Sequence, residues 1–76
     1  MKNLPALTSR KVIKALKKAC FVEDRQKGSH LIMLHPLTNK RVVVPIHPGK
    51  TISKPLLQSI IEQDAGMTIE DFLKLL

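Results

Sequence analysis

Three histidines, His30, His35 and His47, are the side chains of this 76-residue chain best suited to moving protons. An imidazole can accept or donate a proton near neutral pH, so two of them can serve as base and acid in one reaction. Side chains alternate faces along a strand, so His30 and His35, five residues apart on one predicted strand, should point to opposite faces. The pair to consider is therefore His30 and His47.

RNA cleavage is the reaction that such a pair would suit. One group must take the proton of the 2′-hydroxyl, another must protonate the leaving oxygen, and cations must stabilise the charged phosphorane. His30 and His47 would transfer the protons, while Arg25 and Lys27 would supply the charge. The Gly28-Ser29 turn before His30 would let the backbone approach a phosphate closely. The simpler interpretation is that these are surface or half-buried strand histidines without a chemical role.

Other chemistries are less well supported. The chain has one Cys and no HxxxH motif, and at most two histidines converge, which is too few ligands for a zinc site. Cys20 ends an apolar helical stretch, where we expect a small buried thiol with no activating base. Ser29 precedes His30, but adjacency along the chain does not orient a nucleophile towards its base. We expect neither a metal nor another cofactor.

Three short apolar runs predict an antiparallel sheet of three strands. They are separated by hairpin-length loops and cover residues 21–25, 30–35 and 41–46. Pro45 has no amide proton to donate, so it is tolerated on an edge strand but not in the centre of a sheet. The run 30–35 should therefore be the central strand.

The lengths of the two hairpin loops decide which residues face His30. An even second loop, either 38–39 or 37–40, would place His30 directly opposite His47 in a close pair. An even first loop would set Arg25 opposite His30. Helices should cover the other face of the sheet, whose predicted core residues are Leu31, Met33, Val42, Val44 and Ile46.

A basic helix should precede the sheet. Apolar residues recur at helical spacing from Ser9 to Cys20, and Thr8 or Ser9 can cap its start. Its other face carries five cations and no acidic residue, so it cannot form ion pairs within the helix. A solvated face is the simpler interpretation, but five unpaired cations favour phosphate contact. The predicted RNA-binding residues are Arg10, Lys11, Lys14, Lys17, Lys18, Arg25, Lys27, Gly28, Ser29 and Arg41.

Two helices should follow the sheet. Ser53 can cap the first, with Pro55 in its opening turn, and Gly66 should end it. Thr68 can cap a short last helix that contains Phe72. The predicted buried side of the first of these helices comprises Leu56, Leu57, Ile60, Ile61 and Ala65. The fold class is therefore α+β: one domain over residues 1–76, with helices on one face of the sheet and a short extra C-terminal helix.

The net charge of +7 favours a polyanionic or acidic partner. Residues 1–54 carry a net charge of +10, whereas residues 55–76 carry −3. Phe21 and Phe72 are the only aromatic residues besides the histidines, which argues against stacking RNA bases on aromatic platforms. Recognition of backbone and shape is the better expectation.

Export and membrane insertion are not predicted. Residues 1–11 hold no apolar run long enough for a signal segment, and no stretch approaches the ~18 apolar residues of a membrane span. A single cysteine cannot form an internal disulfide. We expect a soluble protein of the reducing cytoplasm.

Three motifs occur together in this chain. Gly28-Ser29-His30 begins one strand, Pro45-Ile46-His47 ends the next, and Ala65-Gly66 precedes Glu70-Asp71-Phe72-Leu73. The combination, from about Ser9 to the C-terminus, resembles the HicA (YcfA-like) toxins of HicAB toxin–antitoxin systems. Many of these toxins have Gly-Thr before the second helix, where this chain has Lys54-Pro55.

The resemblance implies a fold similar to the double-stranded-RNA-binding domain, αβββα, and a ribosome-independent mRNA interferase that inhibits translation and growth. It also implies a HicB-like antitoxin that masks the His30 face. The histidine of the family's Gly-Ser-His motif is catalytic and corresponds to His30. The histidine of the second motif corresponds to His47, and it stays open whether His47 is the acid, a phosphate ligand or a structural residue.

Two other functions fit the same sequence. A non-catalytic double-stranded-RNA-binding module would need the same fold and charge. A pure interaction protein would use its basic surface to bind an acidic partner and would not bind RNA. Cleavage of a purified mRNA without added metal separates the enzyme from both.

Overall fold

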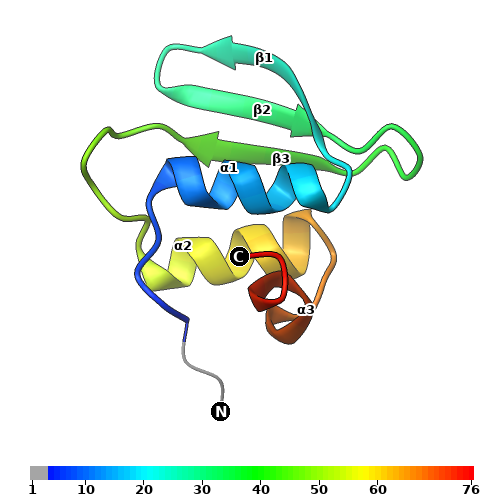
Figure 1. Cartoon of the computed structure of the whole chain (residues 1–76). Coiled ribbons are helices and arrows are strands. Elements are labelled where there is room, and N and C mark those ends of the chain that lie inside the picture. The colour runs from blue at the N-terminus through cyan, green and yellow to red at the C-terminus, as the bar shows by residue number, and fades with distance from the viewer. Residues whose placement is uncertain (1–3) are drawn as a thin grey trace.

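A three-stranded antiparallel sheet forms one layer of the computed structural model, and helices cover one of its faces (Figure 1). The structure describes residues 4–76, so the first three residues of the predicted domain and N-terminal segment lie outside it. The elements are α1 (Ser9–Lys18), β1 (Val22–Lys27), β2 (His30–Leu34), β3 (Arg41–Pro45), α2 (Lys54–Ser59), the π-helical turn η1 (Ile60–Asp64) and α3 (Ile69–Leu73). This order confirms the predicted α+β class.

The first helix, α1, starts where the sequence predicts and ends two residues early. The Thr8 hydroxyl accepts a hydrogen bond from the Lys11 amide at 3.4 Å and so caps the first turn. Cys20 has φ +74°, a left-handed conformation that turns the chain out of the helix. As a result the Cys20 thiol is exposed, and the expectation of a buried cysteine is wrong.

The register between β2 and β3 differs by two residues from the predicted one. His30 lies opposite Pro45, and not opposite His47. The hairpin closes through a hydrogen bond from the His35 amide to the Lys40 carbonyl at 2.9 Å, and Asn39 in the loop has φ +60°. The strand order β1-β2-β3 confirms β2 as the central strand and β3, with Pro45, as an edge.

The two registers place the same side chains on the same faces, because they differ by an even number of residues. The helix-covered face accordingly buries the predicted residues of β2 and β3, Leu31, Met33, Val42 and Val44. Ile46, which follows β3, is only partly buried against this core. The core continues into the helices through Val12, Leu16, Leu57, Ile60, Ile61 and Phe72.

The first hairpin has a two-residue turn, Gly28-Ser29, that places Lys27 opposite His30. A register shift between Glu23 and Arg25 then inserts one extra residue into β1. Arg25 lies opposite Ile32, so its predicted place opposite His30 is wrong.

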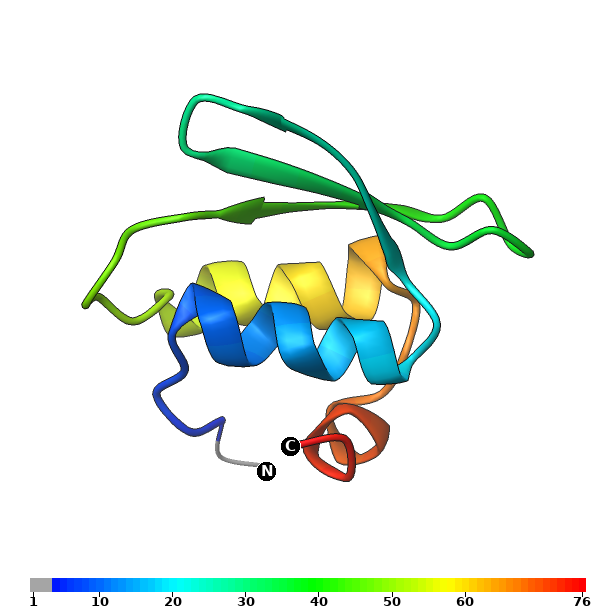
Figure 2. The same cartoon turned by 45° about the horizontal axis from the view of Figure 1, so that its top comes forward.

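The helical layer behind the sheet contains one departure from the predicted pattern (Figure 2). Leu57 is fully buried, whereas Leu56 is 42% exposed and the prediction that it is buried is wrong. Successive residues of a helix lie about 100° apart, so a buried arc centred near Leu57 leaves Leu56 at its margin. No described helix is long and apolar enough to cross a membrane.

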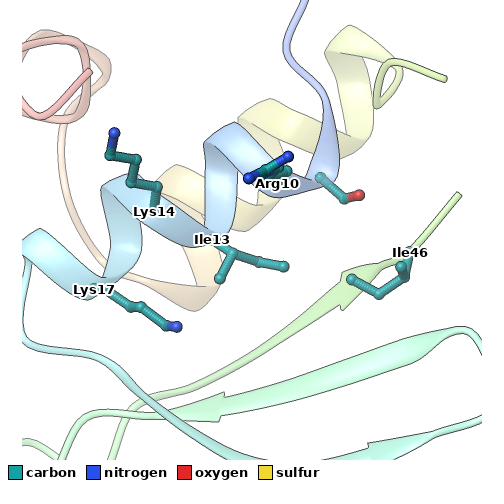
Figure 3. A pocket seen from close by; sticks show the side chains of 6 residues that line it. Arg10, Ile13, Lys14, Lys17 and Ile46 are labelled. Atoms are coloured by element: carbon teal, nitrogen blue, oxygen red, sulfur yellow. The ribbon is translucent and has the colours of Figure 1, made fainter. Parts of the chain in front are cut away.

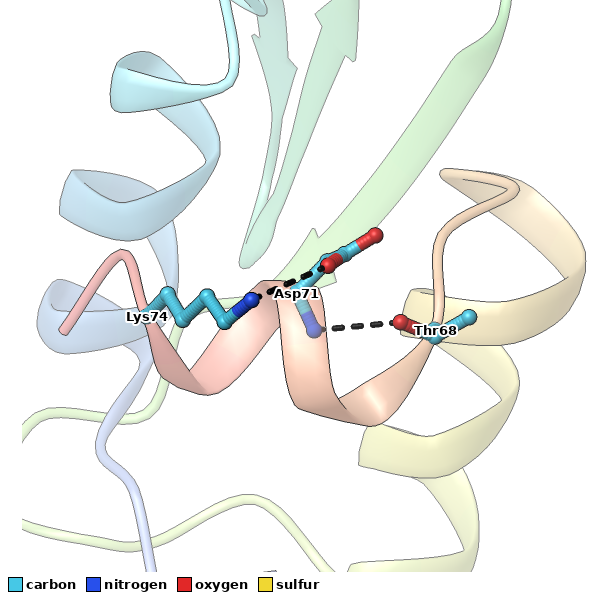
Figure 4. A network of polar contacts seen from close by, with 3 residues as sticks. All are labelled: Thr68, Asp71 and Lys74. Atoms are coloured by element: carbon cyan, nitrogen blue, oxygen red, sulfur yellow. Dashed lines mark hydrogen bonds and ion pairs between the residues drawn. The ribbon is translucent and has the colours of Figure 1, made fainter.

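The turn between η1 and α3 depends on Gly66 and Thr68. Gly66 has φ +69°, and the Lys40 side chain lies against it, so that an added Cβ would overlap Lys40 Nζ. The Thr68 hydroxyl then accepts a hydrogen bond from the Asp71 amide at 3.1 Å and caps α3 (Figure 4). The Asp71 carboxylate lies 3.9 Å from the Lys74 ammonium, one turn further along.

Candidate functional site

One end of the molecule brings together the β1–β2 turn, the end of β3 and the start of α1 (Figure 1). The Ile46 amide donates a hydrogen bond to the Ser29 carbonyl at 2.6 Å, which extends the β2–β3 ladder by one residue. His30 follows Ser29 and His47 follows Ile46. Both predicted catalytic histidines therefore lie at this end.

His30 is the first residue of β2 and is exposed on the face of the sheet that no helix covers. Its cross-strand neighbours are Lys27 and Pro45. His47, also exposed, lies two residues beyond Pro45 and outside β3. The two imidazoles share an end of the fold without forming the directly opposed pair that the sequence predicted.

The predicted cations of the sheet are spread along its open face. Lys27 is the one opposite His30, whereas Arg25 lies next along β1, with its Nε 3.8 Å from an Asp24 carboxylate oxygen. Arg41 begins β3 at the other end, four residues or about 13 Å from Pro45. The structure therefore brings Lys27, and not Arg41, to His30.

The five cations of α1 fall on two sides of the helix. Arg10, Lys14 and Lys17 line a hollow of about 370 Å³ between α1 and the end of β3 (Figure 3). Lys11, Lys14 and Lys18 border another hollow, beside Leu75 and Leu76. Lys17 also pairs with Glu23 of β1, whereas no ion pair within residues 4–76 involves Arg10 or Lys14.

A third hollow, of about 350 Å³, adjoins the one between α1 and β3. Its lining residues are Thr8, Ser9, Arg10, Ile46, His47, Pro48 and Gly49. Ser9, Arg10 and Ile46 line both hollows, so the two adjoin. We call the two hollows together the α1–β3 groove; their lining residues extend from Lys17 to His47.

Two aliphatic residues line this groove, Ile13 and Ile46, of which Ile46 was assigned to the core by sequence. Both are only partly buried, and their side chains lie across the groove from each other (Figure 3). The sequence did indicate that Ile13 lies beside these cations, because it comes three residues after Arg10 and four before Lys17. That spacing places all three on one side of the helix.

His35 has a structural role on the opposite face from His30, as its position predicted. Its Nδ1 accepts hydrogen bonds from the amides of Leu37 and Thr38 at 3.2 and 3.3 Å. Its ring packs edge-on against Phe21, with centroids 5.1 Å apart. A ring used to close a turn in this way is not available to RNA.

Within residues 4–76, no group of three or more Asp, Glu, His or Cys side chains lies close enough together to hold a metal ion. The reactive groups at this end are thus imidazoles, ammonium and guanidinium groups and backbone amides.

Comparison with known proteins identifies the family. No curated protein matches the chain. Residues 9–67 match the family model described as the HicA toxin of bacterial toxin–antitoxin. The matched range begins with α1, includes both His30 and His47, and ends just after Gly66. The chain therefore belongs to the HicA toxin family of bacterial toxin–antitoxin systems.

Proposed function

We propose that this toxin is an endoribonuclease that cleaves mRNA without the ribosome, and that His30 is its catalytic residue. The observation that carries the proposal is the position of His30. It is exposed, follows a tight Gly28-Ser29 turn that a phosphate can approach, and lies opposite Lys27. Loss of messages would then stop translation and growth until the antitoxin binds.

The reaction needs two proton transfers at one phosphate. A neutral imidazole takes the proton of the 2′-hydroxyl, and the 2′-oxygen attacks phosphorus. A protonated imidazole gives its proton to the departing 5′-oxygen as the P–O5′ bond breaks. The products are a 2′,3′-cyclic phosphate and a free 5′-hydroxyl, and no metal ion takes part. Lys27 would stabilise the negative charge that develops on the phosphorane.

The offset between His30 and His47 suits this reaction better than direct contact would. The attacking and leaving oxygens lie on opposite sides of phosphorus in an in-line displacement. Base and acid must therefore flank the phosphate. An offset of two residues leaves room for a phosphate between the two rings, whereas directly opposed rings would fill that space themselves. On this geometry we assign the second proton transfer to His47.

The test is cleavage of a purified mRNA in EDTA by the wild type, His30→Ala and His47→Ala. We expect His30→Ala to lose cleavage and growth arrest, and His47→Ala to lose roughly 10²- to 10⁴-fold in rate, as is typical for one general acid or base. His30 is exposed, so its variant should unfold at the wild-type temperature and still bind RNA. Gln58→Ala, a change of an exposed residue on α2, serves as the control. Full toxicity of His30→Ala would refute the assignment, and RNA binding without cleavage by the wild type would favour a non-catalytic RNA-binding module.

We also propose that a HicB-like antitoxin covers the His30 face. No helix within residues 4–76 covers this face, and Val22 and Val43 are 49% and 38% exposed there. Apolar side chains beside cations match an acidic protein partner with an apolar contact patch. Val43→Glu should weaken the antitoxin complex, whereas Leu37→Glu, on an exposed loop at the other end of the sheet, should not. Equal losses in calorimetric titrations of the two variants would argue against this surface.

A further inference from the structure

We infer that the α1–β3 groove binds single-stranded RNA, holding two consecutive unpaired nucleotides beside the cleavage site. The inference rests on the proposed function for the class of its ligand. It extends that function from His47, at one end of the groove, to residues of α1 that the proton transfers do not use. It assigns a nucleotide-binding role to Arg10, Ile13, Lys17 and Ile46.

The groove has the chemistry of a nucleotide site. Its floor is aliphatic, from Ile13 and Ile46, and its rim is cationic, from Arg10, Lys14 and Lys17. A base can lie on apolar side chains while its phosphate meets the cations, as in other small-ligand sites that combine an apolar lining with a few charged groups. Each hollow, at about 370 and 350 Å³, is at the lower end of the ~300–1,000 Å³ typical of such sites.

Arg10 determines how two nucleotides would be arranged. It lines both hollows, so it lies at the boundary between them. A guanidinium at that boundary can bind the phosphate that joins two nucleotides, with one base on either side. Arg10 has no ion pair within residues 4–76 that would compete for this contact.

The groove selects unpaired RNA over a duplex. In an A-form helix the bases are stacked and paired, and proteins contact mainly phosphates and 2′-hydroxyls across the shallow groove. An aliphatic floor can contact the face of a base only when that base is unstacked. The absence of Trp and Tyr means that this contact relies on aliphatic packing.

The position of the groove connects it to the cleavage site. Ile46 lines the groove and bonds through its amide to Ser29, the residue before His30. His47, the residue after Ile46, also lines the groove. A strand leaving the groove past His47 would therefore reach the His30 face around the end of β3, and its next phosphates would be the candidates for cleavage.

The experiment measures binding in the His30→Ala protein, which separates binding from cleavage. The probes are a fluorescein-labelled decauridylate and a ten-base-pair RNA duplex. The groove variant is Arg10→Gln with Lys17→Gln, and the matched control is Lys11→Gln with Lys18→Gln, the same charge change on the other side of α1. We expect the groove variant to bind decauridylate about tenfold more weakly, while the control changes by much less. If both side chains contact phosphates, the slope of log K against log salt should fall by about 1.4 in the groove variant, at ~0.7 per single-strand contact.

Ile46→Ala tests the base contact separately, since it removes apolar floor without changing charge. It should weaken decauridylate binding and leave the salt slope unchanged. Equal losses in the groove and control variants, or duplex binding as tight as that of decauridylate, would overturn the inference. So would a groove variant that lost antitoxin binding but kept RNA binding, because the groove would then be a protein site. If decauridylate binding depends on the groove but the wild-type protein cuts no RNA, the inference stands and the proposed nuclease activity fails.

Discussion

Gly66 offers a sharp test of the packing between the β2–β3 loop and the helical layer. Substitution by Ala has two separable consequences. The backbone at φ +69° is left-handed, which costs a residue with a Cβ about 1–2 kcal/mol. The new Cβ would also overlap Lys40 Nζ and lie 3.1 Å from its Cε. A lysine ammonium ends a flexible chain and is exposed here, so moving it should cost little.

The expected loss in Gly66→Ala is therefore about 1–2 kcal/mol of unfolding free energy, nearly all from the backbone. For a domain of this size, 1 kcal/mol corresponds to about 4–8 °C in Tm, so the midpoint should fall by about 4–16 °C. Urea denaturation and thermal unfolding followed by circular dichroism measure both quantities. Gly66→Asn carries the same Cβ but tolerates the left-handed region, so it should lose less than half as much.

A double-mutant cycle with Lys40→Ala separates the two causes. If the backbone dominates, Gly66→Ala should cost about the same in the Lys40→Ala background as in the wild type. Full recovery of stability in the double variant would refute the reasoning, because it would show that displacement of Lys40, and not the backbone, sets the cost. An equal loss in Gly66→Asn would point the same way.

Two further predictions follow from the ends of helices. Thr68→Ala removes the hydroxyl that caps α3 at 3.1 Å from the Asp71 amide, and should lower the free energy of unfolding by about 1 kcal/mol. Thr68→Ser keeps a hydroxyl and should retain most of that stability. An unchanged urea midpoint in the Ala variant would contradict the capping role. Cys20 is exposed with φ +74°, so its thiol should react with Ellman's reagent in the native state, and Cys20→Gly should raise Tm by relieving the left-handed strain. A native thiol that reacts only after denaturant is added would show that Cys20 is buried after all.

The fold was largely predictable because its apolar pattern is unambiguous. Helical spacing located α1 and the helices after the sheet, and alternation assigned Leu31, Met33, Val42 and Val44 to the core. Residues with an unusual backbone were not predictable in the same way. The left-handed Cys20 ends α1 early and exposes its thiol, which no periodic pattern reveals because a small apolar residue fits the buried face equally well.

The geometry of the site was predictable only up to a shift of two residues. Pairing His30 with His47 or with Pro45 leaves every side chain on the same face, so the hydrophobic pattern cannot distinguish the two registers. The conformation of the loop decides, and it depends on a left-handed Asn39. The two-residue Gly28-Ser29 turn likewise places Lys27, and not Arg25, opposite His30. The two histidines do lie near the same end of the sheet, but not as the directly opposed pair that was predicted.

The two-residue Gly28-Ser29 turn limits how the length of this chain can change during evolution. The length of this turn sets which β1 residue lies opposite His30, so insertion or deletion of one residue in it would separate Lys27 from the imidazole. The extra residue near Asp24 in β1 shows that a single insertion is accommodated where the strand can bulge, upstream of the turn. In the loop that contains Leu37, 87% exposed and at the other end of the sheet, a change in length would leave the histidines in place. The hairpin loops of this small domain thus differ in evolutionary freedom, and the one beside the reactive histidine is the more constrained.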